Sequence, residues 1–398
     1  MTIAPRPRPA PAAGAAWSWR SRSARRWVYQ ALALAALAAL VAWLFGNTWT
    51  NMRARGIQSG FDFLADTAGF EISEGVLDYS GSDPYWKAFL AGLLNTLRVA
   101  VIGCVLATLG GVLVGVGRLS RNALVRGLCR AYVELFRNVP LLIQLLVWYL
   151  IFVEVLPAPR EPLTLGGWAF LSKGGLALPQ PASGAGWGWV AAGAALGAGT
   201  AAALWLRERR RFRAVGGPPP GVLLQPMAII LAAGFLGWLA GGRPTAWDMP
   251  QPGGFSIEGG MSLTPEFMAV LLGLTAYTTA FVAEVVRAGI VSVGRGQLDA
   301  AASIGLPRAL VLRLVVLPQA LRVIVPPMTN QYLNLTKNSS LSVVVGYPDL
   351  VSIANTSLNQ TGRAVECIAI IMAVYLVLSL GTSALMGAFN RRVAIRER

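Results

Sequence analysis

"GQLDAAASIGLPRALVLRLVVLPQALR", residues Gly296–Arg322, is a polar, alanine-rich segment in a chain otherwise dominated by runs of Leu, Val, Ala and Trp. It is punctuated by Gly305, Pro307 and Pro318, and it lies between two hydrophobic stretches of membrane-spanning length. Connections between helices usually take only about 2–8 residues, so a segment of this length does more than connect. We therefore expect it to have a structure and a role of its own.

The segment predicts two short helices. Residues 297–304 place small and apolar side chains on one face at helical spacing. Gly305 can take the left-handed conformation that ends a helix, and Pro307 disfavours helical backbone at the residue before it. A second helix is expected over about 307–322. Two helices at an angle form a rigid elbow whose alanine-rich first arm suits docking to another protein; the alternative is a connecting loop with a surface helix.

The composition indicates a membrane protein. Of 398 residues, 55% are hydrophobic and only 13% are charged, and the mean hydropathy is +0.56. The net charge of +16 comes from 34 basic and 18 acidic residues, but the arginines cluster beside hydrophobic runs, which favours a topological role over nucleic-acid binding. Histidine is absent and the three cysteines lie far apart. We expect no metal site, no cofactor and no His-based catalytic triad.

The hydropathy pattern predicts an all-α polytopic membrane protein with about eight transmembrane helices. The first hydrophobic run is long and is followed by no A-x-A cleavage pattern before Asn47, which favours an anchoring helix over a signal peptide. The eight expected spans are residues 28–46, 89–116, 135–156, 187–206, 222–240, 267–286, 323–347 and 364–386.

Loop charges predict the orientation of these spans. The N-terminal tail is rich in arginine, whereas the loop after the first span is mostly acidic, with Asp62, Asp66, Glu71, Glu74, Asp78 and Asp83. Every second loop from there on is rich in arginine, as the positive-inside rule requires of cytoplasmic segments. Both termini and the segment at about 291–322 are therefore expected in the cytoplasm.

The elbow carries a family resemblance. The run Asp299-Ala300-Ala301-x3-Gly305, followed by Leu317-Pro318, resembles the "EAA" signature of the membrane subunits of bacterial ABC importers. This resemblance implies a cytoplasmic elbow seated in a cleft of the ATP-hydrolysing subunit. Asp299 replaces the usual Glu, which keeps the charge and shortens its reach. The expected coupling residues are Asp299, Ala300, Ala301, Gly305, Pro307, Leu317 and Pro318.

Other stretches narrow the resemblance to the permeases of the polar amino-acid uptake family, which serves histidine, glutamate, glutamine, arginine and opines. They are "NTLRVAV" (Asn95–Val101), "YVELFRNVPLLIQL" (Tyr132–Leu145), "YTTAFVAEVVRAGI" (Tyr277–Ile290) and "NQYLNLTKNSSLSVVVGYPDL" (Asn330–Leu350). The resemblance covers roughly 89–156 and 265–386, a five-span core. The long subunits of general L-amino-acid and of glutamate/glutamine/aspartate/asparagine systems look most similar, since they too carry an added N-terminal span and an insertion.

The chain is expected to divide accordingly. The regions are a basic tail at 1–27, an extra span and loop at 28–88, a first core segment at 89–156, an insertion with two spans at 157–265, a second core segment at 266–390 and a tail at 391–398. The insertion contains "RERRRFR" (Arg207–Arg213) beside "GGPPPG" (Gly216–Gly221). This arginine run is interpreted as a topology determinant attracted to anionic lipid.

A polar cluster interrupts the seventh hydrophobic run. It follows the pair Pro326 and Pro327 and consists of Asn330, Asn334, Lys337, Asn338, Ser339 and Ser340. A charge at membrane depth costs ~2.5–3.5 kcal/mol on the insertion scale, so it normally faces protein or a water-filled path. We expect this cluster to line the translocation path; the alternative is that it joins neighbouring helices by hydrogen bonds.

Two acid–base pairs at helical spacing are expected to be structural. Glu134 and Arg137 lie three residues apart at the entry of the third span, and Glu284 and Arg287 repeat that spacing at the end of the sixth. For the first pair, support of an ATPase interface is an equally open alternative.

The sequence contains no G-x-x-x-x-G-K-[ST] motif, and "GGVLVGVG" (Gly110–Gly117) favours close helix packing over a phosphate cradle. The chain is thus expected to be a transport subunit without its own ATP site, in the bacterial inner membrane. The resemblance implies as partners the ABC ATPase subunits, a second permease (a paralogue rather than a second copy) and a periplasmic amino-acid-binding protein. The alternatives are a stand-alone ion-coupled transporter, which predicts inverted repeats and a mid-membrane carboxylate, and a membrane scaffold, which leaves the polar cluster unexplained.

Overall fold

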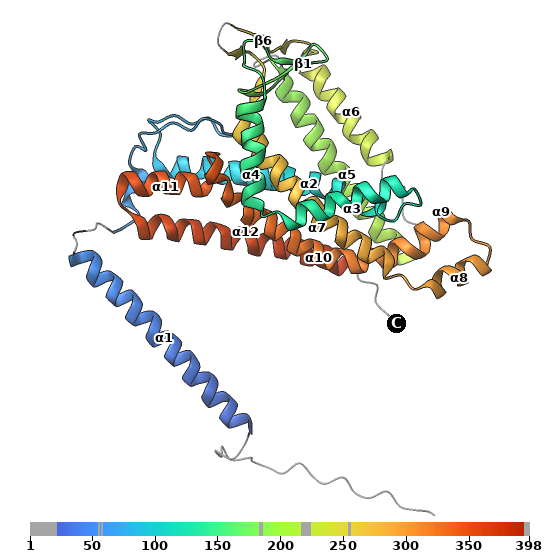
Figure 1. Ribbon diagram of the computed structural model, residues 1–398, viewed down its shortest axis with the longest axis horizontal. Coiled ribbons are helices and arrows are strands. Elements are labelled where there is room, and N and C mark those ends of the chain that lie inside the picture. Colours follow the sequence, from blue (N-terminus) through green and yellow to red (C-terminus); the bar gives the residue numbers. More distant parts are fainter. Residues whose placement is uncertain are drawn as a thin grey trace, which may run out of the picture.

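A computed structural model describes residues 22–54, 56, 59–182, 186–215, 224–253 and 256–393 of the chain. Most of the basic N-terminal tail, the glycine–proline run at 216–221 and the last five residues lie outside the described residues. The described chain is mainly helical (Figure 1).

The long helices are α1 (Arg22–Ala54), α2 (Tyr85–Gly117), α3 (Ala123–Asn138), α4 (Leu141–Leu150) with the π turn η2 (Ile151–Val155), α5 (Trp187–Val215), α6 (Leu224–Ala240), α7 (Pro265–Val291), α10 (Leu317–Asn338), α11 (Leu350–Thr361) and α12 (Ala364–Val393). Most of them follow the predicted hydrophobic runs, but α3 lies mainly before the third run and α11 lies between the seventh and the eighth. Shorter elements are η1 (Asp62–Ala65), α8 (Arg295–Ser303), α9 (Arg308–Val311), the π turn η3 (Leu312–Val316) and the 3-10 helix η4 (Ser339–Val345).

Six helices among the described residues are long and apolar enough to cross a membrane. The expected third span is instead a bent pair, because α3 and α4 meet at 106°. Pro140 lies at that corner and is the residue from which α4 starts, as expected of a residue that cannot continue a helix. The expected fifth span is a shorter apolar helix over residues 225–240. The described residues therefore contain six spans, or seven with the bent pair, and the predicted count of eight is not confirmed.

The bundle centres on α7, which packs against α2, α4 and α10. In Figure 1, α8 and α9 lie at one end of the bundle and α11 at the other, while α1 extends away from it. At Gly111 of α2 a Cβ atom would lie 2.3 Å from Val282 Cγ1 of α7, and at Gly115 it would lie 2.8 Å from the carbonyl oxygen of Ala283. The glycine pattern is thus confirmed as close helix packing, because only glycine admits this approach.

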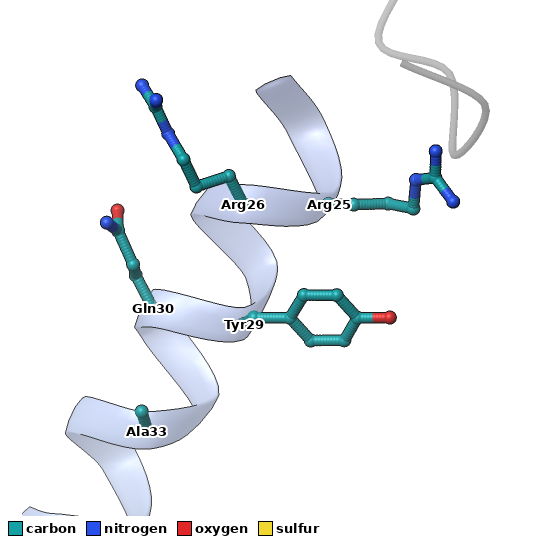
Figure 2. A pocket seen from close by; sticks show the side chains of 5 residues that line it. All are labelled: Arg25, Arg26, Tyr29, Gln30 and Ala33. Atoms are coloured by element: carbon teal, nitrogen blue, oxygen red, sulfur yellow. The ribbon is translucent and has the colours of Figure 1, made fainter. Parts of the chain in front are cut away.

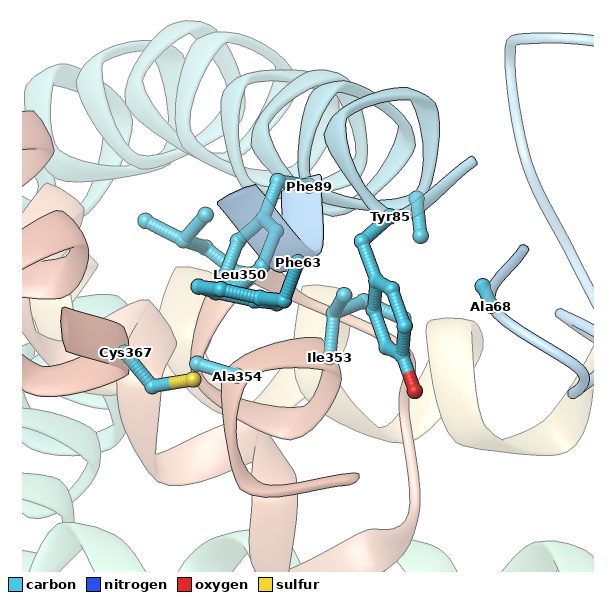
Figure 3. Close-up of a cluster of buried hydrophobic side chains, with 9 residues drawn as sticks. Phe63, Ala68, Tyr85, Phe89, Leu350, Ile353, Ala354 and Cys367 are labelled. Carbon is cyan, nitrogen blue, oxygen red and sulfur yellow. The ribbon is translucent and has the colours of Figure 1, made fainter. Parts of the chain in front are cut away.

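The loop after α1 is packed onto the α11 end of the bundle. Phe63 of η1 is 2% exposed and meets the ring of Tyr85 edge-on at 5.6 Å between centroids. Around them lie Phe89 of α2, Ile353 of α11 and Cys367 of α12 (Figure 3). The added N-terminal segment therefore shares a core with the bundle.

The hollow near the start of α1 is of a different kind. It is lined by Arg25, Arg26, Tyr29, Gln30 and Ala33, all from one helix (Figure 2). It is a depression in the surface of that helix and encloses no site.

The insertion adds short strands to the helical fold. β1 (Leu163–Leu165), β2 (Ala169–Ser172), β3 (Gly175–Leu178) and β8 (Met261–Leu263) form a sheet in the order β1-β2-β3-β8. Two further antiparallel pairs join β4 (Gln180–Pro181) to β5 (Trp247–Asp248) and β6 (Gln251–Pro252) to β7 (Ile257–Glu258). From these strands α5 and α6 extend as a hairpin (Figure 1), packed chiefly against each other.

Candidate functional site

The elbow begins with α8, which ends as its sequence requires. Gly305 has a φ of +74°, in the left-handed region. The N–H of Leu306 donates to the carbonyl of Ala301 at 3.1 Å, and the N–H of Gly305 donates to that of Ala302 at 2.9 Å. These two bonds form a Schellman motif, in which a left-handed residue satisfies the free carbonyls of the last turn. The predicted helix end is confirmed at this residue.

One side of α8 is anchored and the other is free. Ala301 is 4% exposed, and Leu298 packs against the buried residues Val293, Val316 and Ala320. Asp299, Ala300 and Ala302 are exposed, and Ile304 is 74% exposed. The helix thus presents a small-residue surface outward while its other side is fixed to the bundle.

The second arm differs from the predicted separate helix. α9, η3, α10 and η4 join into a continuous apolar helix from Arg308 to Val345. The π turn over 312–316 immediately precedes Pro318, whose ring would otherwise collide with the carbonyl four residues earlier. A short turn at residues 304–307 thus joins α8 to one end of a helix of membrane-spanning length.

The polar cluster occupies one face of α10. Asn330, Asn334 and Lys337 recur at spacings of four and three, and all three are exposed on the isolated chain. Lys337 has no ion-pair partner among the described residues. Two carboxylates that could pair with Lys337 have other partners. Glu284 bonds to arginines, and Glu366 accepts a hydrogen bond from the N–H of Gly60 at 2.7 Å.

The remaining members of the cluster are less exposed. Ser339 is 1% exposed and donates to the carbonyl of Thr336 at 2.7 Å, while Ser340 donates to the carbonyl of Lys337 at 2.7 Å. Asn338 is half-buried at the end of α10. The structure therefore separates an exposed stripe of Asn330, Asn334 and Lys337 from hydroxyls that bond their own backbone.

A second polar site lies where α2, α3 and α7 meet. Glu284 Oε1 accepts from Arg287 Nη2 at 2.6 Å, and its Oε2 accepts from Arg118 Nη1. Arg137 Nη1 lies 3.9 Å from the same Oε2. The carboxylate thus joins three arginines from three segments, of which sequence spacing identifies only Arg287.

The other expected pair is rearranged. Glu134 bonds to Arg130 Nε at 2.8 Å, whereas Arg137 reaches Glu284 and lies 5.2 Å from the Phe281 ring centroid. Both pairings of Glu134 fit helical spacing, so sequence cannot choose between them. The orientation of α3 across α7 decides it.

The sequence analysis assigns no role to a polar junction at the opposite end, although Asn95 and Arg98 lie in the quoted stretch Asn95–Val101. Arg98 Nη1 bonds to Glu74 Oε1 at 2.7 Å, and Thr264 Oγ1 donates to Glu74 Oε2. Asn95 Nδ2 donates to the carbonyls of Glu74 and Pro348, each at 2.9 Å. The sequence does not distinguish Glu74 from the other acidic residues of the loop after the first span. An arginine inside a hydrophobic span is the available signal, because such a charge needs a partner.

Comparison with known proteins identifies a family whose matched region contains both the elbow and the polar cluster. A family model described as "Binding-protein-dependent transport system inner membrane component" matches residues 219–395. The chain belongs to this family of membrane transport subunits, as relatives 39–45% identical over more than nine-tenths of its length show, and it is a multi-pass membrane protein.

Similar proteins narrow the family further. YhdX of Escherichia coli, whose name describes an amino-acid ABC transporter permease protein, is 45% identical over 94% of this chain and 96% of its own length. The general L-amino acid transport system permease protein AapQ of Rhizobium johnstonii is 43% identical over 93% of this chain and 92% of its own. The glutamate/glutamine/aspartate/asparagine transport system permease protein BztB of Rhodobacter capsulatus is 39% identical over 93% of each chain. The resemblance inferred from the sequence motifs is confirmed.

Proposed function

We propose that this chain is the permease subunit of an ABC importer that carries polar L-amino acids across the inner membrane, driven by separate ATPase subunits. The exposed polar stripe on α10 is the observation that carries the path assignment. Family membership argues against the two alternatives, a stand-alone ion-coupled transporter and a scaffold.

The exposed stripe of Asn330, Asn334 and Lys337 requires a polar environment. Lys337 lies inside the continuous helix from Arg308 to Val345, and an unpaired ammonium exposed to hydrocarbon is unfavourable by ~2.5–3.5 kcal/mol. Asn330 and Asn334 add amide groups to the same face. A second permease across a water-filled path satisfies all three, and a paralogue is the proposed partner. The ammonium then binds the carboxylate that all amino acids share.

The elbow is the proposed link to ATP hydrolysis. Asp299, Ala300 and Ala302 form the exposed side of α8, where small side chains permit close approach to a cleft in an ATPase subunit. Movement of α8 is transmitted through the continuous helix to the stripe on α10. A periplasmic binding protein delivers the substrate at the α11 end.

This scheme requires α8 in the cytoplasm and the loop after α1 outside, with both termini cytoplasmic. Ser73 and Ser303 are both exposed and lie at these two ends. A cysteine at Ser73 should react with a membrane-impermeant thiol reagent added outside intact cells, and one at Ser303 should react only after permeabilisation. The reverse pattern contradicts the orientation.

Lys337→Met tests the path. The change removes the charge and keeps the apolar stem, so assembly and basal ATP hydrolysis should persist. Uptake of acidic and neutral amino acids should fall about tenfold or more, since a charge-assisted hydrogen bond contributes ~1.5–3 kcal/mol.

The chain supplies a matched control. Lys173 is exposed in the turn between β2 and β3, and Lys173→Met should leave uptake unchanged. Uptake in proteoliposomes and melting of the purified complex are measured together. A Lys337→Met complex that melts early and transports normally per folded complex would show that the lysine is structural.

A further inference from the structure

α3 crosses from the end of α2 to the middle of α7. Cys129, in its middle, packs on Gly117, the last residue of α2, where a Cβ atom would lie 2.6 Å from Cys129 Sγ. One turn later Val133 is buried against Ala280 and Ala283 of α7. Successive turns of α3 therefore meet successive helices, as expected of a helix that runs roughly perpendicular to the bundle.

The last turn of α3 is linked to the residue that follows α2. Arg137 lies 3.9 Å from Glu284 Oε2, and Arg118, which follows α2 directly, bonds to that same oxygen. The end of α2 and the end of α3 thus meet at one carboxylate. Because Gly117 is the last residue of the apolar helix α2, this contact places α3 toward the end of the bundle that carries α8.

The corner after α3 is held by hydrogen bonds. Gln144 is 6% exposed, and its Nε2 donates to the carbonyls of Phe136 and Val139, each at 2.9 Å. These carbonyls lose helical partners because Pro140 has no N–H and the helix ends there. The 106° turn into α4 (Figure 1) is therefore a fixed feature.

The surface of α3 divides into three arcs. The arc toward the protein carries Cys129, Tyr132, Val133 and Phe136, with the Tyr132 hydroxyl donating to the carbonyl of Ala276 at 2.8 Å. The other two arcs face outward.

The first outward arc is apolar and the second is charged. Leu124, Leu128 and Leu135 recur at helical spacing and are 70%, 63% and 60% exposed. Arg126 and Arg130 lie on the opposite side and are exposed. Amphipathic helices that lie in the membrane interface show this combination.

We propose that α3 is an in-plane interfacial helix whose leucine arc enters the hydrocarbon of the leaflet on the α8 side, while Arg126 and Arg130 bind the phosphate groups of anionic lipids. Charge complementarity selects this occupant, since Glu134, which bonds to Arg130 Nε at 2.8 Å, is the only acid on α3 and leaves the helix with a net positive charge. The proposal requires a membrane-spanning chain and is independent of the substrate and of the path assignment.

Spin labels at Leu128→Cys and Arg130→Cys test the depth of the two arcs. The intact complex in bilayers of phosphatidylcholine and phosphatidylglycerol is probed with oxygen, which concentrates in hydrocarbon, and with a water-soluble nickel chelate. The label at 128 should favour oxygen and the label at 130 should favour nickel. The wild-type complex, labelled in parallel, reports any reaction of the partly or fully buried native cysteines.

Two results at position 128 overturn the proposal. Preference for nickel places the leucine arc in water, and protection from both reagents places it against an ATPase or a second permease. For the arginine arc, phosphatidylglycerol is titrated into the complex in neutral detergent and the mobility of the label at 128 is followed. Arg126→Gln should raise the midpoint roughly fivefold, equivalent to ~1 kcal/mol, whereas Arg53→Gln on the exposed end of α1 should not. Equal midpoints refute a role for the arginine in lipid binding.

Discussion

Replacement of Gly305 separates the conformation of the elbow from its shape. The residue has a φ of +74°, and no atom lies within 4 Å of the position that a Cβ would take. A larger side chain therefore meets no steric obstacle, and only the backbone conformation opposes it. Left-handed backbone costs an L-residue ~1–2 kcal/mol, and more for a β-branched one, whereas asparagine tolerates it better.

Gly305→Val should thus weaken the capped form of α8 by a factor of roughly 10–30, while Gly305→Asn should weaken it far less. The two bonds that Gly305 and Leu306 make to the last turn are lost together, and the exposed face of α8 loses its fixed direction. In proteoliposomes with the ATPase subunits, Val at 305 should lower the amino acid imported per ATP hydrolysed, and Asn should largely preserve it. Equal coupling in the two variants would refute the argument that this left-handed residue transmits the motion.

Two further changes probe packing and pH dependence. Gly111→Ala forces a methyl group to 2.3 Å from Val282 Cγ1 and should destabilise the α2–α7 contact by about 1–3 kcal/mol. The control is Gly381→Ala, where no atom lies within 4 Å of the added Cβ, and it should leave the melting temperature of the purified complex unchanged or higher. Equal melting temperatures for the two variants would contradict the packing. Burial raises the pKa of Asp349 from 3.8 to about 7, so the folded chain keeps a proton that the unfolded chain has lost, and this residue makes stability fall as pH rises from about 4 to 7. Asp349→Asn retains a helix-capping side chain and should remove that share of the pH dependence of melting; an unchanged slope would show that Asp349 is not its source.

The features that sequence predicted well are local ones. Whether a segment enters the membrane depends on summed hydropathy over about 20 residues, and six long runs appear as apolar helices. The end of α8 depends on a glycine with freedom of φ and a proline two residues on, so Gly305 could be assigned from its neighbours. The glycines of α2 likewise signal close packing by themselves, although not against which helix.

Tertiary structure decided what depends on approach between distant segments. The hydropathy pattern predicts one span over 135–156, whereas the chain bends by 106° at Pro140, and packing of α3 on α2 and α7 accompanies that bend. Arg130 and Arg137 both lie at helical spacing from Glu134. Glu134 pairs with Arg130, whereas Arg137 lies close to Glu284 of α7. Glu74 and Arg98 are 24 residues apart in sequence and meet because the loop after α1 folds back over α2. Hydropathy and helical period describe one segment at a time, whereas the partner of a charge is set by which segments the fold brings within about 4 Å.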